Sequence, residues 1–212
     1  MTFPLVLSKN FLAFLVTSFF LLSVLVDPAF AHHPFGMGDS SELSFWQSLL
    51  SGIGHPVLGP DHLLFILGIA FVGLKKTKKW VLPLLAMGLA GSGLAQLLHL
   101  PDLIAPWAEA LVSLTLAIEG LIVLNYVNSK WLLPMFALHG YLLGSTIVGA
   151  EPSPLIGYFF GLLFSQVVLL LIVTVVSQRF INWLRDKGRL LTLTAGVWIG
   201  IGSAFSWVAL VD

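Results

Sequence analysis

Long apolar runs separated by short polar connections recur along the chain. Their lengths approach the roughly 20 residues that an α-helix needs to cross a bilayer. The six runs expected to span cover about 60–74, 80–99, 105–127, 131–149, 154–177 and 190–210. Because the connections between them are short, consecutive helices should be antiparallel. The pattern therefore predicts an all-α fold, a polytopic transmembrane helix bundle with six spanning helices.

The start of the chain has a different pattern. Lys9 precedes an apolar stretch, Phe11–Val26, and Ala29-Phe30-Ala31 follows as a small-x-small cleavage site, which is the arrangement of a secretory signal peptide. We therefore expect residues 1–31 to be a cleaved signal peptide and residues 32–212 to form a single six-helix membrane domain. An uncleaved anchor is the alternative, because the apolar core of about sixteen residues is slightly longer than the roughly 7–15 residues usual for a signal peptide.

The composition supports a membrane location. Hydrophobic residues make up 58% of the chain, charged residues make up 9%, and the mean hydropathy is +0.98, whereas soluble domains have roughly 45–50% apolar and about 25% charged residues. The lipid bilayer is therefore the expected surrounding. The net charge is zero and no basic patch lies outside the connections, which argues against nucleic-acid binding. The chain has no cysteine, so a transition metal would be bound by imidazole, carboxylate or backbone oxygen.

Basic residues gather in alternate connections, which predicts the orientation. The connections on the opposite side, 100–106 and 150–154, contain Asp102 and Glu151 but no Lys or Arg. By the positive-inside rule the basic connections are cytoplasmic, so we expect a multi-pass protein of the cell (plasma or inner) membrane with both mature termini on the outer side. The residues that set this bias are Lys75, Lys76, Lys78, Lys79, Lys130, Arg179, Arg185, Lys187 and Arg189.

The most unusual polar stretch is His55-Pro56-Val57-Leu58-Gly59-Pro60-Asp61-His62, at the mouth of the first spanning run. Its prolines and glycine disfavour a regular helix, so we expect a broken helix after a short apolar stretch at 45–53, which is too brief to span and should lie at the membrane interface. Ionisable groups at membrane depth indicate a functional site. Asp61 can ligate a cation directly or orient an imidazole by accepting its ring N–H. The alternative is an interfacial turn whose polar groups cap the helix.

The third spanning run carries two carboxylic acids. Glu109 lies near its outer end, and Glu119 lies ten residues further in, roughly 15 Å along the helix axis. We expect Glu109 to reach water and Glu119 to be neutral, paired or facing a hydrated path. For Glu119, a structural pairing with Asn125 or with another partner is an alternative to a transport role.

The fourth spanning run contains His139, with apolar residues on both sides of His139-Gly140-Tyr141. A lone membrane histidine often joins two helices by a hydrogen bond, but the small Gly140 and Gly144 allow close helix approach. We expect His139, and also Gln166 of the fifth run, to approach His62.

These residues resemble a known family. His55-Pro56, Gly59 and Asp61-His62 are similar to the HPxxGxDH signature of the HupE/UreJ proteins, and Ala31-His32-His33 after the signal peptide resembles cyanobacterial-type members. The similarity continues in Ala108-Glu109-Ala110 with Ser113, in His139-Gly140-Tyr141, in Gly149-Ala150-Glu151, and in Tyr158 with Gly161. Family members commonly have a histidine or acidic residue where this chain has Leu143, Gly144 and Ser145, and a fifth-helix histidine where it has Gln166.

The resemblance implies a permease that admits a divalent metal, Ni²⁺ or Co²⁺, from the outer side. It has no catalytic residues and no permanent cofactor, because the metal is the cargo. In this hypothesis Glu109 or Glu119 assists charge compensation, and a homo-oligomer or a metallochaperone would be the protein partner. The other residues assigned to the metal are His32 and His33 for capture, and His55, Asp61 and His62 for a central site with His139.

Two other functions are compatible with these residues. The first is a non-transporting membrane protein that binds metal as an accessory or sensor for metalloenzyme maturation. The second is an intramembrane metal-dependent hydrolase, in which the same histidines and aspartate activate water. Flux of metal into liposomes separates these functions from a permease.

Overall fold

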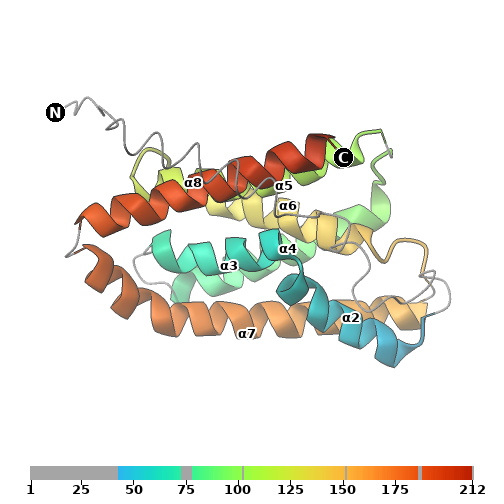
Figure 1. Ribbon diagram of the computed structural model, residues 1–212. Helices are drawn as coiled ribbons and strands as arrows, with labels where there is room; N and C mark the ends of the chain where they lie inside the picture. The colour runs from blue at the N-terminus through green and yellow to red at the C-terminus, as the bar shows by residue number, and fades with distance from the viewer. Residues whose placement is uncertain (1–42, 73–77, 102, 151, 186–187, 212) are drawn as a thin grey trace.

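The computed structural model describes residues 43–72, 78–101, 103–150, 152–185 and 188–211 (Figure 1). Within these ranges all regular structure is helical, which confirms the predicted all-α class. The predicted signal peptide, His32 and His33 lie outside the described residues. The elements are α2 (Phe45–Leu58), α3 (Pro60–Val72), α4 (Lys78–Leu97), α5 (Ala105–Val123), a 3₁₀ turn (Ser129–Trp131), α6 (Leu132–Ser145), α7 (Pro152–Arg185) and α8 (Gly188–Val211).

Four of the described helices are long and apolar enough to cross a membrane, in α4, α5, α7 and α8. A multi-pass membrane protein follows from these helices. Helix α3 has 13 residues and α6 has 14, fewer than the roughly 20 needed to cross a bilayer as a single helix. The prediction of six spans is therefore not confirmed and stays a prediction.

Helix ends that carry described basic residues lie at one end of the bundle (Figure 1). Lys79 near the start of α4, Lys130 before α6 and Arg189 at the start of α8 share this end. The C-terminus of α8 and the connection between α6 and α7 lie at the other end. This arrangement agrees with the antiparallel order expected from short connections.

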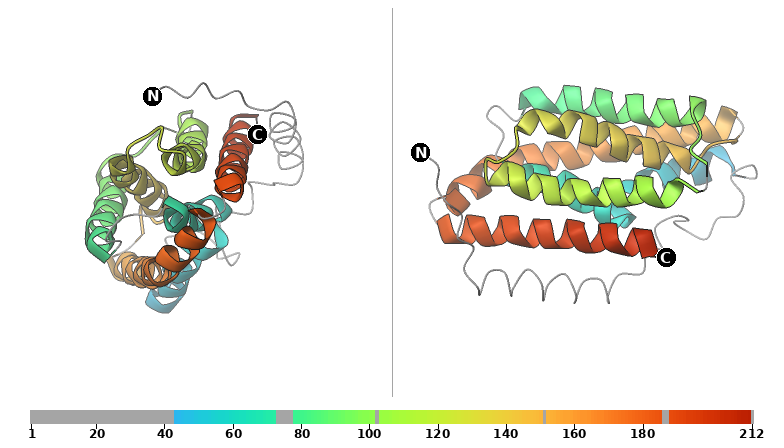
Figure 2. Two further views of the ribbon diagram at one scale, coloured as in Figure 1. Left: turned by 90° about the vertical axis from the view of Figure 1, so that its left-hand side faces the viewer. Right: turned by 90° about the horizontal axis from the view of Figure 1, so that it is seen from above.

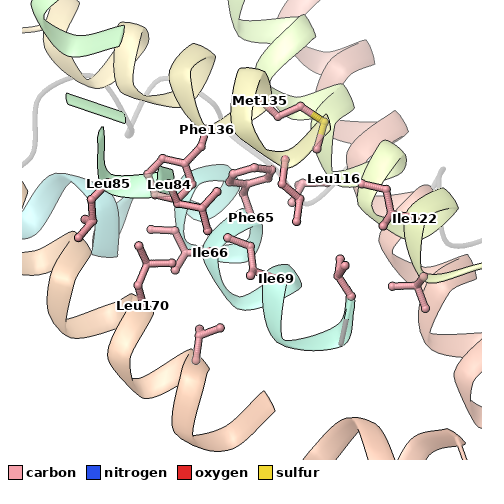
Figure 3. Close-up of a cluster of buried hydrophobic side chains, with 14 of the residues drawn as sticks. Phe65, Ile66, Ile69, Leu84, Leu85, Leu116, Ile122, Met135, Phe136 and Leu170 are labelled. Atoms are coloured by element: carbon pink, nitrogen blue, oxygen red, sulfur yellow. The ribbon is translucent and has the colours of Figure 1, made fainter. Parts of the chain in front are cut away.

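Helix α3 lies inside the bundle. The most extensive helix contacts are those of α2 with α7, α5 with α8 and α4 with α6. Helix α3 contacts α2, α5, α7 and α8 (Figures 1 and 2). Phe65, Ile66 and Ile69 of α3 are buried in the main hydrophobic core. Figure 3 shows these side chains among residues from four other helices, namely Leu84, Leu85, Leu116, Ile122, Met135, Phe136 and Leu170.

Small residues bring the paired helices into backbone contact. A Cβ added at Gly91 of α4 would lie 1.9 Å from the carbonyl oxygen of Ala137 in α6, and one added at Gly140 would lie 2.0 Å from the carbonyl oxygen of Gly88. The Ser92 hydroxyl donates a hydrogen bond to the carbonyl oxygen of Gly140 at 2.7 Å. Close approach of this kind is typical of membrane helices, where packing and hydrogen bonds drive association.

The structure corrects the predicted end of the third spanning run. Helix α5 ends at Val123 rather than near residue 127, because Asn125 adopts a left-handed backbone conformation, φ 63°. The N–H of Tyr126 donates to the carbonyl oxygen of Leu121, and the N–H of Asn125 donates to that of Ile122, both at 2.9 Å. This is a Schellman motif with asparagine at the left-handed position, which asparagine tolerates better than most residues.

The expected break in the first polar motif is confirmed. Helix α2 ends at Leu58, Gly59 is extended with φ −73° and ψ 108°, and α3 begins at Pro60. The N–H of Gly59 still donates to the carbonyl oxygen of His55 at 2.9 Å. The short apolar stretch at 45–53 is part of α2, which packs along α7; its position relative to a membrane stays a prediction.

The contact between α4 and α6 makes a prediction about stability. Gly91→Ala should destabilise the protein by about 1–3 kcal/mol, because the added methyl group overpacks a backbone contact. Gly93→Ala is the matched control, since a Cβ there meets nothing within 4 Å. Thermal unfolding in detergent measures both, and equal melting temperatures for the two variants would contradict the backbone contact.

Candidate metal-binding site

The centre of the site is a direct hydrogen bond between two imidazoles. His62, in the first turns of α3, and His139, in the middle of α6, are 6% and 3% exposed. Their Nδ1 atoms lie 2.7 Å apart. The expectation that His139 approaches His62 is therefore confirmed.

A third helix supports His139 from the other side of its ring. Thr115 Oγ1 of α5 lies 2.7 Å from His139 Nε2, and the same hydroxyl donates to the carbonyl oxygen of Val112 at 2.5 Å. The Phe65 ring stacks on the His139 ring, with centroids 4.0 Å apart and planes inclined by 15°. Both nitrogens of His139 thus have partners, and one face of its ring is covered.

His55 lies beside this pair at the end of α2. Its ring centroid is 5.9 Å from that of His62, and its Nδ1 lies 3.1 Å from the hydroxyl oxygen of Tyr158 in α7. The Tyr158 hydroxyl donates to the carbonyl oxygen of Leu143 at 2.6 Å. Thr146 adds a longer contact to His55 Nδ1 at 3.5 Å. Tyr158 therefore fixes the orientation of His55 and joins α2, α6 and α7.

Asp61 lies at the helix break with its side chain half-buried in the first turn of α3. A Cβ added at Gly59 would lie 2.9 Å from His62 Cδ2 and 3.5 Å from Asp61 Oδ1. The imidazole edge and the carboxylate therefore border the same space, which glycine leaves open. Among the described residues, no hydrogen bond joins Asp61 to a histidine ring, so the interpretation that Asp61 orients an imidazole finds no support there.

The described residues contain no group of three or more His, Asp and Glu side chains already arranged around a single metal position. The Nδ1 atoms of His62 and His139 lie at hydrogen-bond distance from each other. What the arrangement offers a metal is the outer edge of the His62 ring and the Asp61 carboxylate beside the Gly59 break.

Glu119 lies one turn further along α5 than Thr115, on the same helix face. It is fully buried, and its Oε2 accepts a hydrogen bond from Trp198 Nε1 of α8 at 3.1 Å. Its Oε1 has no hydrogen-bond partner among the residues that the structure describes. Gly68 makes room for this carboxyl group, because a Cβ there would lie 1.9 Å from Oε2. The partner of Glu119 is thus Trp198 rather than the Asn125 considered from the sequence.

The other described candidates from the sequence lie elsewhere on α5, α6 and α7. Glu109 is half-buried and precedes Thr115 by six residues, roughly 9 Å along the axis of α5. Gln166 is buried, but its Oε1 has no hydrogen-bond partner and no hydrogen bond links it to His62 among the described residues. Ser145 is exposed and donates to the carbonyl oxygen of Leu142 at 2.7 Å.

Thr115, Tyr158 and Trp198 have no site role predicted from the sequence. Thr115 carries a faint signal, because it precedes Glu119 by four residues and so shares its helix face. Tyr158 belongs to the family-like block but has no polar neighbour in the sequence. Trp198 has no signal, since tryptophan is common in membrane helices near interfaces.

Comparison with known proteins gives one match. The family model described as HupE / UreJ protein matches residues 20–205, which include every helix in the site. No curated protein and no solved structure matches the chain.

The contacts of His55 predict the effect of losing the Tyr158 hydroxyl. Tyr158→Phe should destabilise the protein by about 1–3 kcal/mol, because buried hydrogen-bond partners lose a neighbour. Tyr126→Phe is the control; this tyrosine is 56% exposed, and its change should stay within about 0.5 kcal/mol. Thermal unfolding of both purified variants measures the difference, and a Tyr158→Phe protein as stable as the parent would contradict the assigned hydrogen bonds.

Proposed function

The chain belongs to the HupE/UreJ family, and we propose that it is a permease that takes up a divalent transition metal, nickel or cobalt, from the outer side of the membrane. The observation that carries this proposal is the buried His62–His139 pair beside a helix break that also holds Asp61. Ionisable side chains inside a membrane helix bundle are costly, so by default they indicate a functional site such as an ion path.

The charge distribution supports the proposed direction of uptake. The basic helix ends lie at one end of the bundle, and α3 runs toward them from the Gly59 break, which lies partway along the bundle (Figure 1). With the basic end in the cytoplasm, an ion arriving from outside meets the break first. His32 and His33 at the mature amino terminus would capture the ion before it reaches the break.

The ligands we propose for the central site are His62, Asp61 and His55. Their imidazole and carboxylate groups suit both nickel and cobalt, and the general affinity order of these metals does not choose between them. Asp61 would meet the ion directly, because His139 and Tyr158 already hold the neighbouring histidine rings. His139 completes the group through its bond to His62.

The inner half of the proposed route would be closed by apolar side chains. Phe65, Ile66 and Ile69 of α3 are buried in the main hydrophobic core (Figure 3). Passage of an ion would therefore require α3 and its neighbours to rearrange. In this proposal Glu119, one turn past Thr115, would compensate the charge of an ion that has left the histidine pair, and Glu109 would do so nearer the outer end.

Loss of the central ligands should abolish uptake. In cells that lack other uptake routes, His62→Ala and Asp61→Ala should reduce accumulation of radioactive nickel or cobalt to background, because each removes a donor at the break. His99→Ala is the control, since His99 is an exposed histidine next to the end of α4. Unchanged accumulation at equal membrane abundance would reject the site.

Flux into liposomes tests the function itself. The purified protein should carry Ni²⁺ or Co²⁺ into liposomes, and the His62→Ala protein should not. Metal bound by the purified protein without any flux would support the accessory or sensor function instead.

A further inference from the structure

The hydrogen bonds around Thr115 fix the direction of a longer chain of hydrogen bonds. A threonine hydroxyl has one hydrogen to donate and lone pairs to accept with. Thr115 lies 2.5 Å from the carbonyl oxygen of Val112, which can only accept. The hydroxyl hydrogen is therefore used there, and Thr115 Oγ1 accepts from His139 Nε2 at 2.7 Å.

The direction at Thr115 determines which nitrogens carry hydrogen in both histidines. His139 contacts a hydroxyl and an imidazole but no carboxylate, and a buried charge without an opposite charge is costly, so its ring is neutral. A neutral ring with hydrogen on Nε2 has a lone pair on Nδ1. His62 Nδ1, 2.7 Å away, must then donate, and in a neutral His62 ring the lone pair is on Nε2.

The position of the His62 ring shows where that lone pair lies. Nε2 is bonded to Cδ2, and Cδ2 borders the space over Gly59 that Asp61 Oδ1 also borders. His62 Nε2 makes no hydrogen bond with any described residue. The ring atom next to this nitrogen, Cδ2, is therefore the one that lies beside the helix break and the carboxylate.

We propose that Thr115 and His139 are positioning residues that fix the tautomer of His62, so that His62 Nε2 is the metal-binding nitrogen and His139 is not itself a ligand. This inference rests on the proposed metal permease function. It adds Thr115, a residue of α5 that cannot ionise, to the residues that this function needs. Residues that orient a metal-binding histidine in this way typically change metal affinity by about 10–100-fold when they are replaced.

The tautomer can be read without any metal. In protein labelled with ¹⁵N-histidine and reconstituted in nanodiscs, the nitrogen shifts should show His62 protonated at Nδ1 and His139 protonated at Nε2, with signals assigned by their loss in His62→Asn and His139→Asn. Thr115→Val should give a mixture of His62 tautomers, and Thr115→Ser should restore the single one. His62 protonated at Nε2 in the parent protein would overturn the proposal.

Metal affinity provides the second readout. Titration of purified protein with Co²⁺, followed by its absorption bands, should show affinity lowered about 10-fold in Thr115→Val and restored in Thr115→Ser. Thr174→Val is the control, because the Thr174 hydroxyl bonds only within α7, to the carbonyl oxygen of Leu170. Equal affinity in Thr115→Val and the parent would overturn the proposal.

The two proposals fail separately. A parent protein that binds Co²⁺ but carries none rejects the permease and leaves the tautomer result standing. A parent protein that carries metal with the opposite His62 tautomer rejects only the positioning role. If Thr115→Val does not fold, the tautomer of the parent protein and the affinity of Thr115→Ser still decide the question.

Discussion

The arrangement depends on one constraint: two imidazoles inside a membrane bundle have to serve as each other's hydrogen-bond partner. Lipid offers no hydrogen-bond partner, so a polar side chain at this depth needs one from another helix. His62 and His139 meet this need at 2.7 Å. For the rings to touch, α3 has to enter the interior of the bundle, and it can do so because the chain breaks at Gly59 and starts a new helix. The break and the buried pair are therefore parts of one solution.

Close backbone packing against outer helices holds His139 and His55 in place. Helix α6 carries His139 and is pressed against α4 through Gly88 and Gly140, so it cannot move toward α4 to lengthen the contact. Helix α2, which carries His55, is pressed against α7 in the same way, since a Cβ at Gly52 would lie 2.1 Å from the carbonyl oxygen of Tyr158. Small residues thus do more than allow helices to associate. They place the polar groups within hydrogen-bond distance.

The sequence predicts what depends on local backbone chemistry or on the cost of polar groups in lipid. The break at Gly59 follows from two prolines and a glycine, and the approach of His139 to His62 follows from the need for a partner. It does not predict which neutral groups complete the site, because Thr115 and Tyr158 are ordinary residues of apolar helices until their neighbours are known. The end of α5 is missed because the left-handed conformation of Asn125 depends on a single residue within an otherwise continuous apolar run. Whether α3 and α6 span is likewise a tertiary matter, since short helices can be covered by longer ones.

The number of donors at the break has a consequence for function. A structural metal site typically encloses its ion with a full set of protein ligands, and such a site releases metal slowly. If both nitrogens of His139 are used in hydrogen bonds, the protein offers fewer donors at the break, and water completes the coordination of the ion. Binding would then stay exchangeable, as the proposed permease function requires. In the proposed permease, the same hydrogen bonds that satisfy the buried imidazoles would also keep the metal from being held too tightly, so that the stability of the bundle and the release of the ion would have a common origin.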